Sequence, residues 1–450
     1  MRALLVGGYV RDTLLGLQPK DRDFVVIGES PESMRQRGYE LAGAHFPVFL
    51  HPVTKEEYAL ARSEKSTGHG HGEFECAWEG VSLEDDLKRR DCTINAMAFA
   101  EDGTLIDPYN GLADLRAGKL RQVSRHFQED PLRVLRVARL AARYNFTVDP
   151  GLMALMRHMV SKDMLETLPG ERLWQETEKA MLTDTPRVFF EVLDECGALE
   201  RVFPELAAMK HVPQRPDYHA EGDVWVHVLM VLDEACAFSA ELNDSRKLRI
   251  RLAALFHDLG KIETPFEELW ADNGDLLGSH HGHEDADRFG PLLDDIAQRL
   301  RMPSDIKQFV HRVSLVHQKV HEIFKASGRG IVSLYEALDL SRVMRHDEHI
   351  LDDVALACAA DNYGRRTLMK DGSITKPTTY TQADFFKKTM LAVNGVKPGD
   401  VIQEALRRGK PLSHGKDNLI CAQRRSVKHL IAEHKKLTGD ERESLMGTRA

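Results

Sequence analysis

The chain has 450 residues, which is long enough for about three domains and for more than one hydrophobic core. Its composition, 42% hydrophobic and 29% charged residues, is that of an ordinary globular protein, and no apolar run approaches the ~20 residues that cross a bilayer. The net charge of −9 excludes a protein that coats nucleic acid indiscriminately, but it leaves room for a local basic surface.

The first predicted elements are an apolar run at residues 4–6, a Gly7-Gly8 turn, a short helical pattern, and a second apolar run that starts with Asp21 and Asp23. Residues two apart in a strand point to the same side of a sheet, so both carboxylates would face one space. Paired carboxylates suit Mg²⁺, and the bare N–H groups of a glycine turn suit phosphates. Together the two features predict a site for a nucleoside triphosphate with a metal ion. The alternative for either feature alone is a surface hairpin with solvated aspartates.

Strand signals follow at residues 48–50 and 58–62, and then a glycine-rich stretch at residues 66–72 that we expect to be a flexible loop. The next motif begins with Arg89-Arg90-Asp91 and continues as an apolar helix or strand. Arginine forks match phosphate oxygens, so this cluster predicts contact with the triphosphate or ribose. A solvated helix start is the alternative.

Residues 114–144 form a local basic patch, in which lysine and arginine outnumber the acids. Within it we predict a helix with Asp130 near its N-cap and Pro131 in its first turn. Three arginines step by three along one face, while Val and Ala residues can pack on the other. Asp130 and Arg133 would offer acceptor and donor groups to the edge of a base. The alternative is a solvated charged face.

These motifs, GGYVRDTLLG followed by DRD, RRDCTINAMA at 89–98, DPYNG at 107–111 and EDPLR at 129–133, resemble those of the class II tRNA CCA-adding and poly(A) polymerase family. Cys92 stands where that family usually has an aromatic or aliphatic residue. The resemblance implies that Asp21 and Asp23 are catalytic and hold Mg²⁺, and that the glycine-rich loop helps to add the terminal nucleotide. It also implies a set of ATP- and CTP-binding residues, with Asp91 at the sugar and with Asp130 and Arg133 selecting the base: Gly8, Arg11, Arg90, Asp91, Asp130, Arg133, Arg136 and Arg139.

After a helical stretch without chemistry of its own, at residues 146–210, histidines and aspartates recur in a second cluster. They lie on helical or helix-flanking segments at His227, His257-Asp258, His283, His317 and Asp361. Imidazoles with carboxylates bind a divalent transition metal, which can turn bound water into hydroxide for attack on phosphate. A satisfied core histidine or a capping pair is the alternative at each single position.

This order resembles that of the HD-domain phosphohydrolases. By that resemblance His227, His257, Asp258 and Asp361 hold the metal, Ni²⁺ or another divalent transition metal, while His283 and His317 line a phosphate site. His280, His281 and His321 are nearby competitors for those last two positions. The implied activities are those of a 2′,3′-cyclic phosphodiesterase, 2′-nucleotidase and phosphatase. Beyond this cluster we expect a polar loop at residues 370–379 and a charged helix from Ala422 that frays toward the C-terminus.

The predicted fold class is α+β, with a polymerase-beta-type nucleotidyltransferase head of mixed sheet and helices followed by an all-α neck, body and HD-domain tail. The expected boundaries are 1–140 for the head, 141–215 for the helical neck and body, 216–365 for the HD phosphohydrolase domain and 366–450 for the helical C-terminal tail. The six scattered cysteines and the absence of a signal peptide predict reduced thiols in a cytoplasmic protein.

The predicted function is template-independent addition and repair of the 3′-terminal CCA of tRNA, as in the bacterial multifunctional members of the family. Its partners would be tRNA, ATP and CTP, without a membrane, and the protein would be a monomer or a homodimer. The alternatives are a poly(A) polymerase built on the same head and a CC-only enzyme, which would lack the glycine-rich loop. Two other classes remain: an HD nucleotide hydrolase with a ligand-binding head, and a non-catalytic tRNA-binding chaperone.

Overall fold

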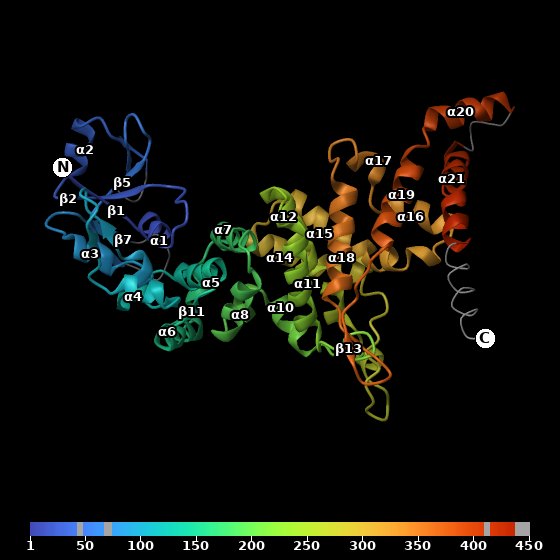
Figure 1. The fold of residues 1–450 in the computed structure, drawn as a ribbon, viewed down its shortest axis with the longest axis horizontal. Coiled ribbons are helices and arrows are strands. Elements are labelled where there is room, and N and C mark those ends of the chain that lie inside the picture. Colours follow the sequence, from blue (N-terminus) through green and yellow to red (C-terminus); the bar gives the residue numbers. More distant parts are fainter. Residues whose placement is uncertain (43–47, 67–73, 409–414, 437–450) are drawn as a thin grey trace. The chain divides into compact units, whose positions relative to one another are not determined.

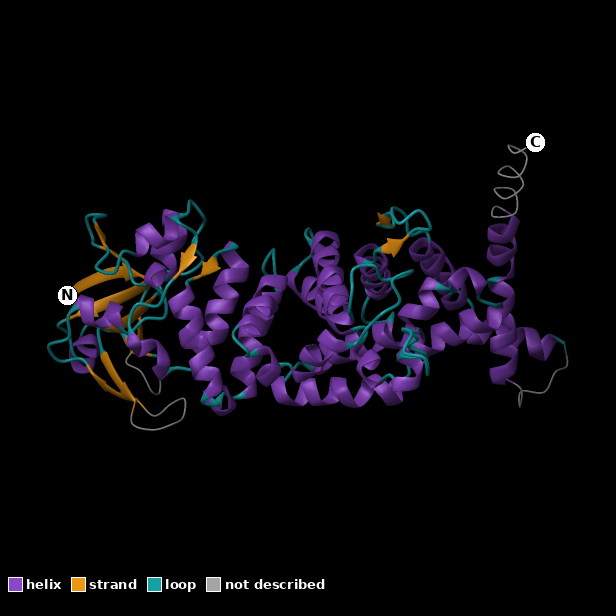
Figure 2. Ribbon diagram, turned by 90° about the horizontal axis from the view of Figure 1, so that it is seen from below, coloured by secondary structure: helices purple, strands orange, loops and turns teal. Residues whose placement is uncertain are grey.

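A computed structural model of the chain describes residues 1–42, 48–66, 74–408 and 415–436 (Figure 1). The chain divides into two compact units, Met1–Pro204 and Glu205–Ala450. The first unit contains a large sheet, and the second is almost entirely helical (Figure 2). Most of the predicted glycine-rich loop, from residue 67 on, lies outside the described residues, as does the predicted frayed end after residue 436.

The first unit is built on a mixed seven-stranded sheet with the strand order β3-β4-β5-β2-β1-β8-β9. Its strands are β1 (Arg2–Val6), β2 (Asp23–Ile27), β3 (Glu40–Leu41), β4 (Val48–Leu50), β5 (Glu57–Leu60), β8 (Ala98–Phe99) and β9 (Leu105–Ile106). Strand β2 lies at the centre, antiparallel to β1 and parallel to β5. The predicted mixed sheet with helices is therefore confirmed.

The sheet is held by apolar side chains on both of its faces. Leu4 and Val25 belong to one buried cluster, and Val26, Phe49 and Leu60 belong to another. Successive residues of a strand point to opposite faces, so neighbouring valines can serve the two clusters. Because Leu5 pairs with Phe24, the start of β2 lies beside the end of β1 and the glycine turn that follows it.

Helices surround and follow this sheet. In chain order they are α1 (Gly8–Leu14), α2 (Pro31–Gln36), α3 (Leu83–Lys88), α4 (Gly111–Arg116), α5 (Leu132–Tyr144), α6 (Pro150–Ser161), α7 (Gly170–Met181), α8 (Arg187–Glu195) and α9 (Leu199–Val202). Short elements complete the unit: η1 (Thr93–Asn95), η2 (Arg125–Glu129), η3 (Met164–Thr167), the pair β6 (Ser63–Ser66) and β7 (Phe74–Ala77), and the pair β10 (Lys119–Leu120) and β11 (Thr147–Val148).

Helix α5 connects the sheet region with the helices that follow. Val134, Val137, Ala138 and Ala141 are fully buried, and the helix packs against α7 and α8. The helix begins as its sequence suggests, because the Asp130 side chain accepts a hydrogen bond from the Leu132 N–H at 3.0 Å. This apolar face fixes the direction in which the arginines on the rest of the helix point.

The second unit is a helical assembly. Its elements are α10 (Pro204–Ala208), η4 (Met209–His211), α11 (Val224–Ser239), α12 (Asp244–Phe256), η5 (Leu259–Glu263), α13 (Phe266–Leu269), α14 (Ala286–Leu300), α15 (Ser304–His321), η6 (Ile323–Lys325), α16 (Gly328–Ala337), α17 (Leu340–Val343), α18 (Ile350–Gly364), α19 (Gln382–Asn394), α20 (Pro398–Arg407) and α21 (Gly415–Ser426). Helix α11 packs against α12 and α18, and α12 packs against α15 and α18. These four helices lie side by side and form its core (Figure 1).

The C-terminal part differs from the sequence prediction in two places. The expected polar loop contains a small hairpin of β12 (Thr367–Leu368) and β13 (Ile374–Thr375), because Asp371 accepts a hydrogen bond from the Ser373 N–H and Gly372 adopts a φ of 82°. The last charged helix starts at Gly415, before the expected Ala422, since α21 packs against α16, α19 and α20. Composition alone does not reveal such packing.

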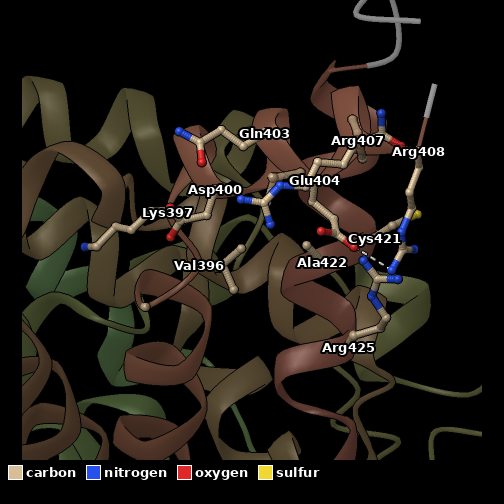
Figure 3. A pocket seen from close by; sticks show the side chains of 14 residues that line it. Val396, Lys397, Asp400, Gln403, Glu404, Arg407, Arg408, Cys421, Ala422 and Arg425 are labelled. Atoms are coloured by element: carbon tan, nitrogen blue, oxygen red, sulfur yellow. Dashed lines mark ion pairs between the residues drawn. The ribbon is translucent and has the colours of Figure 1, made fainter. Parts of the chain in front are cut away.

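Helices α20 and α21 border a cavity of about 650 Å³ whose lining includes basic, acidic and uncharged side chains (Figure 3). Arg407 of α20, Arg408 directly after it and Arg425 of α21 lie around it, and Arg408 pairs with Glu404 at 2.6 Å. Among the described residues, no helix is both long and apolar enough to cross a membrane. In the described part of the chain, Cys92, Cys196, Cys236, Cys358 and Cys421 form no disulfide.

Candidate functional sites

The first candidate site is a cavity of about 630 Å³ in the first unit. The β1–α1 turn, the start of β2, the segment after α3 and one side of α5 contribute to its lining. All ten residues that the sequence assigned to nucleotide and magnesium line it: Gly8, Arg11, Asp21, Asp23, Arg90, Asp91, Asp130, Arg133, Arg136 and Arg139. The fold thus gathers four separate motifs around one space.

The glycine turn makes this gathering possible. Gly7 precedes α1 with a φ of 68°, which L-residues rarely adopt, and a Cβ at this position would lie 2.9 Å from Nη1 of Arg90. A larger residue would therefore strain the turn and displace the guanidinium. Glycine at residue 7 leaves room for the Arg90 guanidinium beside the start of α1.

The two aspartates lie at the start of the central strand. Asp23 is the first residue of β2, whereas Asp21 lies in the loop before it, and both line a smaller cavity of about 140 Å³ as well. Loss of surrounding water raises the pKa of Asp23; the Arg90 guanidinium opposes this rise, and the Asp21 carboxylate adds to it. Two mutually repelling carboxylates beside a polar cavity are a donor set that fits a hard divalent cation.

A buried carboxylate that the sequence reasoning missed holds the arginine pair. Asp86, on α3, is fully buried and accepts hydrogen bonds from Nη2 of Arg89 at 2.5 Å and from Nη2 of Arg90 at 3.2 Å. The i, i+3 and i, i+4 spacings to the arginines are the signal that could have revealed it. Asp86 orients both guanidinium groups without lining the cavity itself.

Asp91 is also buried, with both carboxylate oxygens engaged. Oδ1 accepts from the Cys92 N–H at 2.7 Å and from Nδ2 of Asn95 at 2.8 Å, while Oδ2 accepts from Nε of Arg136 at 3.0 Å. Burial by itself would raise the pKa of Asp91, but Arg136 and these hydrogen bonds hold it well below its usual value. The carboxylate is therefore ionised and fixes Arg136 at the cavity.

Asp12 is a third buried carboxylate, and it joins α1 to the end of α5. It accepts hydrogen bonds from Nε of Arg11 at 2.8 Å, from the Tyr144 hydroxyl at 2.6 Å and from Nη2 of Arg143 at 2.8 Å. Arg11 also donates to Oδ1 of Asn95 at 2.5 Å. The Arg11 guanidinium is thus held between two acceptors at the wall of the cavity.

Helix α7 contributes to the same cavity, although the sequence predicted no chemistry there. Glu176 is buried and accepts a hydrogen bond from Nε of Arg139 at 2.5 Å, and Lys179 lines the cavity. Arg133 donates to the His126 carbonyl oxygen at 2.5 Å. Each arginine on the cavity side of α5 is therefore fixed by a partner from another segment.

The second candidate site lies in the second unit, where α11, α12, α15 and α18 meet. Asp361 Oδ1 lies 3.2 Å from Nε2 of His227 and 3.7 Å from Nε2 of His257. Asp258 Oδ1 lies 3.3 Å from Nε2 of His283 and 3.6 Å from Nε2 of His317. All six residues predicted for the metal and phosphate sites are buried in one cluster.

The hydrogen bonds of the four imidazoles define which nitrogen faces the acids. Nδ1 of His257, His283 and His317 contacts a backbone carbonyl oxygen three residues earlier, at 2.8, 2.7 and 2.8 Å. Nδ1 of His227 contacts Oε1 of Glu221 at 2.8 Å. Because these oxygens can only accept, each Nδ1 carries a proton, and in the neutral ring the Nε2 lone pair points toward the carboxylates.

The cluster fits a divalent transition metal. Nε2 of His227 and His257, Oδ1 of Asp258 and Oδ1 of Asp361 are buried and have no hydrogen-bond partner. Buried polar atoms are rarely left in this state, and an ion coordinated by imidazole and carboxylate would satisfy them. Burial also lowers the pKa of His317 to about 4, so this ring is neutral at physiological pH.

The three competing histidines differ in position. His280 uses both ring nitrogens outside the cluster, with Thr264 Oγ1 at 2.8 Å and the Pro213 carbonyl oxygen at 3.0 Å. His281 lies on the exposed surface, 3.3 Å from Ser279 Oγ. His321 does reach the cluster, since its Nε2 lies 2.6 Å from Oδ2 of Asp361.

A cavity of about 340 Å³ opens beside the cluster, and His283 lines it together with basic residues. Lys261 and Arg365 also line it, and Nζ of Lys261 lies 2.7 Å from Oδ2 of Asp258. Gly260 lets these segments approach, because a Cβ there would lie 1.9 Å from the His283 carbonyl oxygen. Cations beside a candidate metal cluster suit an anionic ligand such as a phosphate ester.

Comparisons with known proteins agree with this arrangement. Residues 3–121 match the poly A polymerase head domain, residues 145–210 match the probable RNA and SrmB-binding site of polymerase A, and residues 224–363 match the HD domain. A multifunctional CCA protein of Hahella chejuensis (strain KCTC 2396) is 44% identical over 408 residues, which are 90% of each chain.

Solved structures show the same fold at low sequence identity. A CCA-adding enzyme in complex with CTP has a TM-score of 0.55 and 17% identity, covering 97% of this chain and 91% of that one. A Thermotoga maritima CCA-adding enzyme complexed with tRNA has a TM-score of 0.53 and 18% identity, covering 88% of this chain and 79% of that one. From the identity and coverage of the curated relative, this chain belongs to the family of multifunctional CCA proteins.

Proposed function

We propose that the protein adds and repairs the 3′-terminal CCA of tRNA from CTP and ATP, and that its HD domain hydrolyses phosphate esters at RNA ends. The observation that carries the first activity is one cavity that the paired aspartates line together with Arg133, Arg136 and Arg139 of α5. Membership of the family supports both activities.

In the first site, Asp21 and Asp23 would hold Mg²⁺, which when bound favours ionisation of the RNA 3′-hydroxyl and stabilises the leaving pyrophosphate. Arg11 and Arg90 would bind the triphosphate, since guanidinium groups match phosphate oxygens and both are pre-oriented by buried acids. The 3′-hydroxyl oxygen attacks the α-phosphorus of the nucleotide, the bond to the pyrophosphate breaks, and the hydroxyl proton is released.

Selection of C or A would take place at the start of α5. Asp130 and Arg133 lie one helical turn apart and both line the cavity, so an acceptor and donors are available to a base edge. Guanine and uracil present the opposite arrangement of donors and acceptors at the atoms that distinguish them from adenine and cytosine. Such a protein surface needs no nucleic-acid template.

In the second site, His227, His257, Asp258 and Asp361 would hold a divalent transition metal, with Ni²⁺ as the proposed ion. When bound, the metal supplies a hydroxide-like water for attack on phosphorus. His283 and His317 would line the phosphate site, and Lys261, which borders both the cluster and the adjoining cavity, would also bind the phosphate group. The proposed substrates are 2′,3′-cyclic phosphates, 2′-phosphates and other phosphomonoesters at damaged RNA ends.

The decisive experiment for the first site is incubation of tRNA that lacks its 3′ end with CTP and ATP, followed by sequencing of the product. We expect addition of CCA, no extension with GTP or UTP, and loss of addition in the Asp21→Asn, Asp23→Asn variant. Oligo(A) extension without CTP incorporation would instead identify a poly(A) polymerase. Wild-type addition by the double variant would disprove the site.

The proposed binding partners and cellular compartment follow from these activities. The partners would be tRNA, CTP and ATP, and the compartment would be the cytoplasm, where tRNA and nucleotides are present. The proposed domains remain a head at 1–140, a neck and body at 141–215, an HD domain at 216–365 and a tail at 366–450. Size-exclusion chromatography with light scattering would decide between monomer and homodimer.

A further inference from the structure

Glu221 is a buried carboxylate that belongs to none of the motifs in the sequence. Its side chain is 1% exposed and lies just before α11. Oε1 lies 2.9 Å from Nδ1 of His219 and 2.8 Å from Nδ1 of His227, while Oε2 accepts from the Arg366 N–H at 2.8 Å. One side chain thus receives hydrogen bonds from three positions.

We propose that Glu221 is a positioning residue for metal binding, acting through His227. This inference rests on the proposed role of His227 as a metal ligand. A neutral imidazole can carry its proton on either nitrogen, and the partner of one nitrogen decides the state of the other. With the proton held on Nδ1 by Glu221, Nε2 presents its lone pair toward Asp361 at 3.2 Å and Asp258 at 3.6 Å.

His227 differs from the other three imidazoles of the cluster in how it is held. His257, His283 and His317 each contact a backbone carbonyl oxygen through Nδ1, which no substitution removes. His227 instead depends on the carboxylate of another residue. Its ring orientation can therefore be altered without touching a proposed metal ligand.

The position of Glu221 adds a second argument. The HD match covers residues 224–363, so Glu221 precedes it and Arg366 follows it. The carboxylate ties these two flanking segments together directly behind the cluster. A carboxylate hydrogen-bonded to a ligating histidine also increases the basicity of that ligand and so strengthens its bond to a metal.

The test is Ni²⁺ binding to the full-length, metal-free protein, measured by calorimetry for the wild type, Glu221→Gln and Glu263→Gln. A glutamine has the same shape but no charge, and only its carbonyl oxygen can accept, so it cannot serve both the Arg366 N–H and the imidazoles. We expect roughly 10–100-fold weaker Ni²⁺ binding for E221Q, the range typical of lost outer-shell partners. Glu263 is an exposed glutamate on η5, and E263Q should bind as the wild type does.

Two further measurements separate positioning from a purely structural role. With Co²⁺ as the probe, the ligand-field absorption spectrum of E221Q should differ from that of the wild type, whereas that of E263Q should not. CCA addition by the first unit should be unchanged in E221Q. If E221Q does not fold, Glu221→Asp serves instead, because it keeps the charge and withdraws it by one methylene; weaker binding is again expected.

Unchanged Ni²⁺ affinity and an unchanged Co²⁺ spectrum in a folded E221Q protein would overturn the proposal. The variant Asp258→Ala distinguishes this outcome from failure of the proposed metal site. If D258A loses Ni²⁺ binding while E221Q keeps it, Glu221 has no positioning role. If D258A binds Ni²⁺ normally, the metal site itself is misassigned, and the Glu221 proposal fails with it.

Discussion

Asp91 shows at the scale of one residue how a motif position can act by holding another group. Its carboxylate is buried against Arg136, whose side chain is 37% exposed. Removing one partner of a fully buried ion pair costs about 3–5 kcal/mol, and the partial exposure of Arg136 reduces the expected cost to about 2 kcal/mol. Asp91→Asn should therefore lower the unfolding temperature of the first unit.

The stability difference between the wild type and this variant should also depend on pH. The pKa of Asp91 is lower in the folded protein than in the unfolded chain, so its stabilisation is fully present above the unfolded pKa, about 4. It is lost as the pH falls through the lower folded pKa. Thermal unfolding of wild type and D91N should differ by a constant amount from pH 7 to 5 and converge below pH 4. Asp184→Asn, the same change at an exposed aspartate, is the matched control.

Asp12 is another buried carboxylate that orients an arginine at the cavity. Asp12→Asn keeps the shape of the side chain but removes the charge that orients Arg11. A hydrogen bond to a charged group contributes about 1.5–3 kcal/mol, so we expect the KM for both CTP and ATP to rise roughly tenfold. Steady-state kinetics with truncated tRNA measures this. Unchanged KM values would show that Arg11 does not need the carboxylate.

At the scale of an element, the segment before α19 reaches the cluster through Tyr380. The Tyr380 hydroxyl donates to Nδ1 of His321 at 2.8 Å, and Nε2 of His321 donates to Oδ2 of Asp361. This assignment follows because the carboxylate can only accept. The chain of hydrogen bonds leaves Oδ1 of Asp361 for the proposed metal.

Tyr380→Phe removes the first of these hydrogen bonds. A typical net contribution of about 1 kcal/mol predicts a roughly fivefold loss of Ni²⁺ affinity. Tyr363→Phe is a matched control, because the Tyr363 hydroxyl donates to the Thr378 carbonyl oxygen and not to a histidine of the cluster. Calorimetry measures the Ni²⁺ affinity of both variants. If Tyr380→Phe binds Ni²⁺ as tightly as the wild type and Tyr363→Phe do, His321 needs no support from this segment.

Contiguous motifs predicted which elements carry the sites. These motifs, through their resemblance to the CCA-adding and HD-domain families, predicted ten residues that line one cavity and six that form one cluster. The supporting acids could not be found in the same way. Asp12 lies 131 residues from its partner Arg143, and a buried aspartate looks the same in sequence as a solvated one.

At the scale of the whole molecule, the two candidate sites lie in separate compact units. A ligand that binds only the folded form stabilises it by RT ln(1 + [L]/Kd), which is about 2.7 kcal/mol at one hundred times Kd. Ni²⁺ at that concentration should raise the unfolding midpoint of the second unit by roughly 5–10 °C, since each kcal/mol shifts the midpoint of a unit of this size by about 2–4 °C. The transition of the first unit should not move, and His257→Ala should abolish the shift. Scanning calorimetry with and without a chelator measures both transitions.

Helices α11, α12, α15 and α18 meet at a group of buried imidazoles and acids. This arrangement has a consequence for the lifetime of the protein in the cell. An ion held by His227, His257, Asp258 and Asp361 would link α11, the end of α12 and α18, so its loss would let these helices separate more often and expose the backbone to proteases. In cells starved of transition metals, the second unit would then be degraded faster. The cellular level of this protein would follow metal supply even when its gene is transcribed at a constant rate.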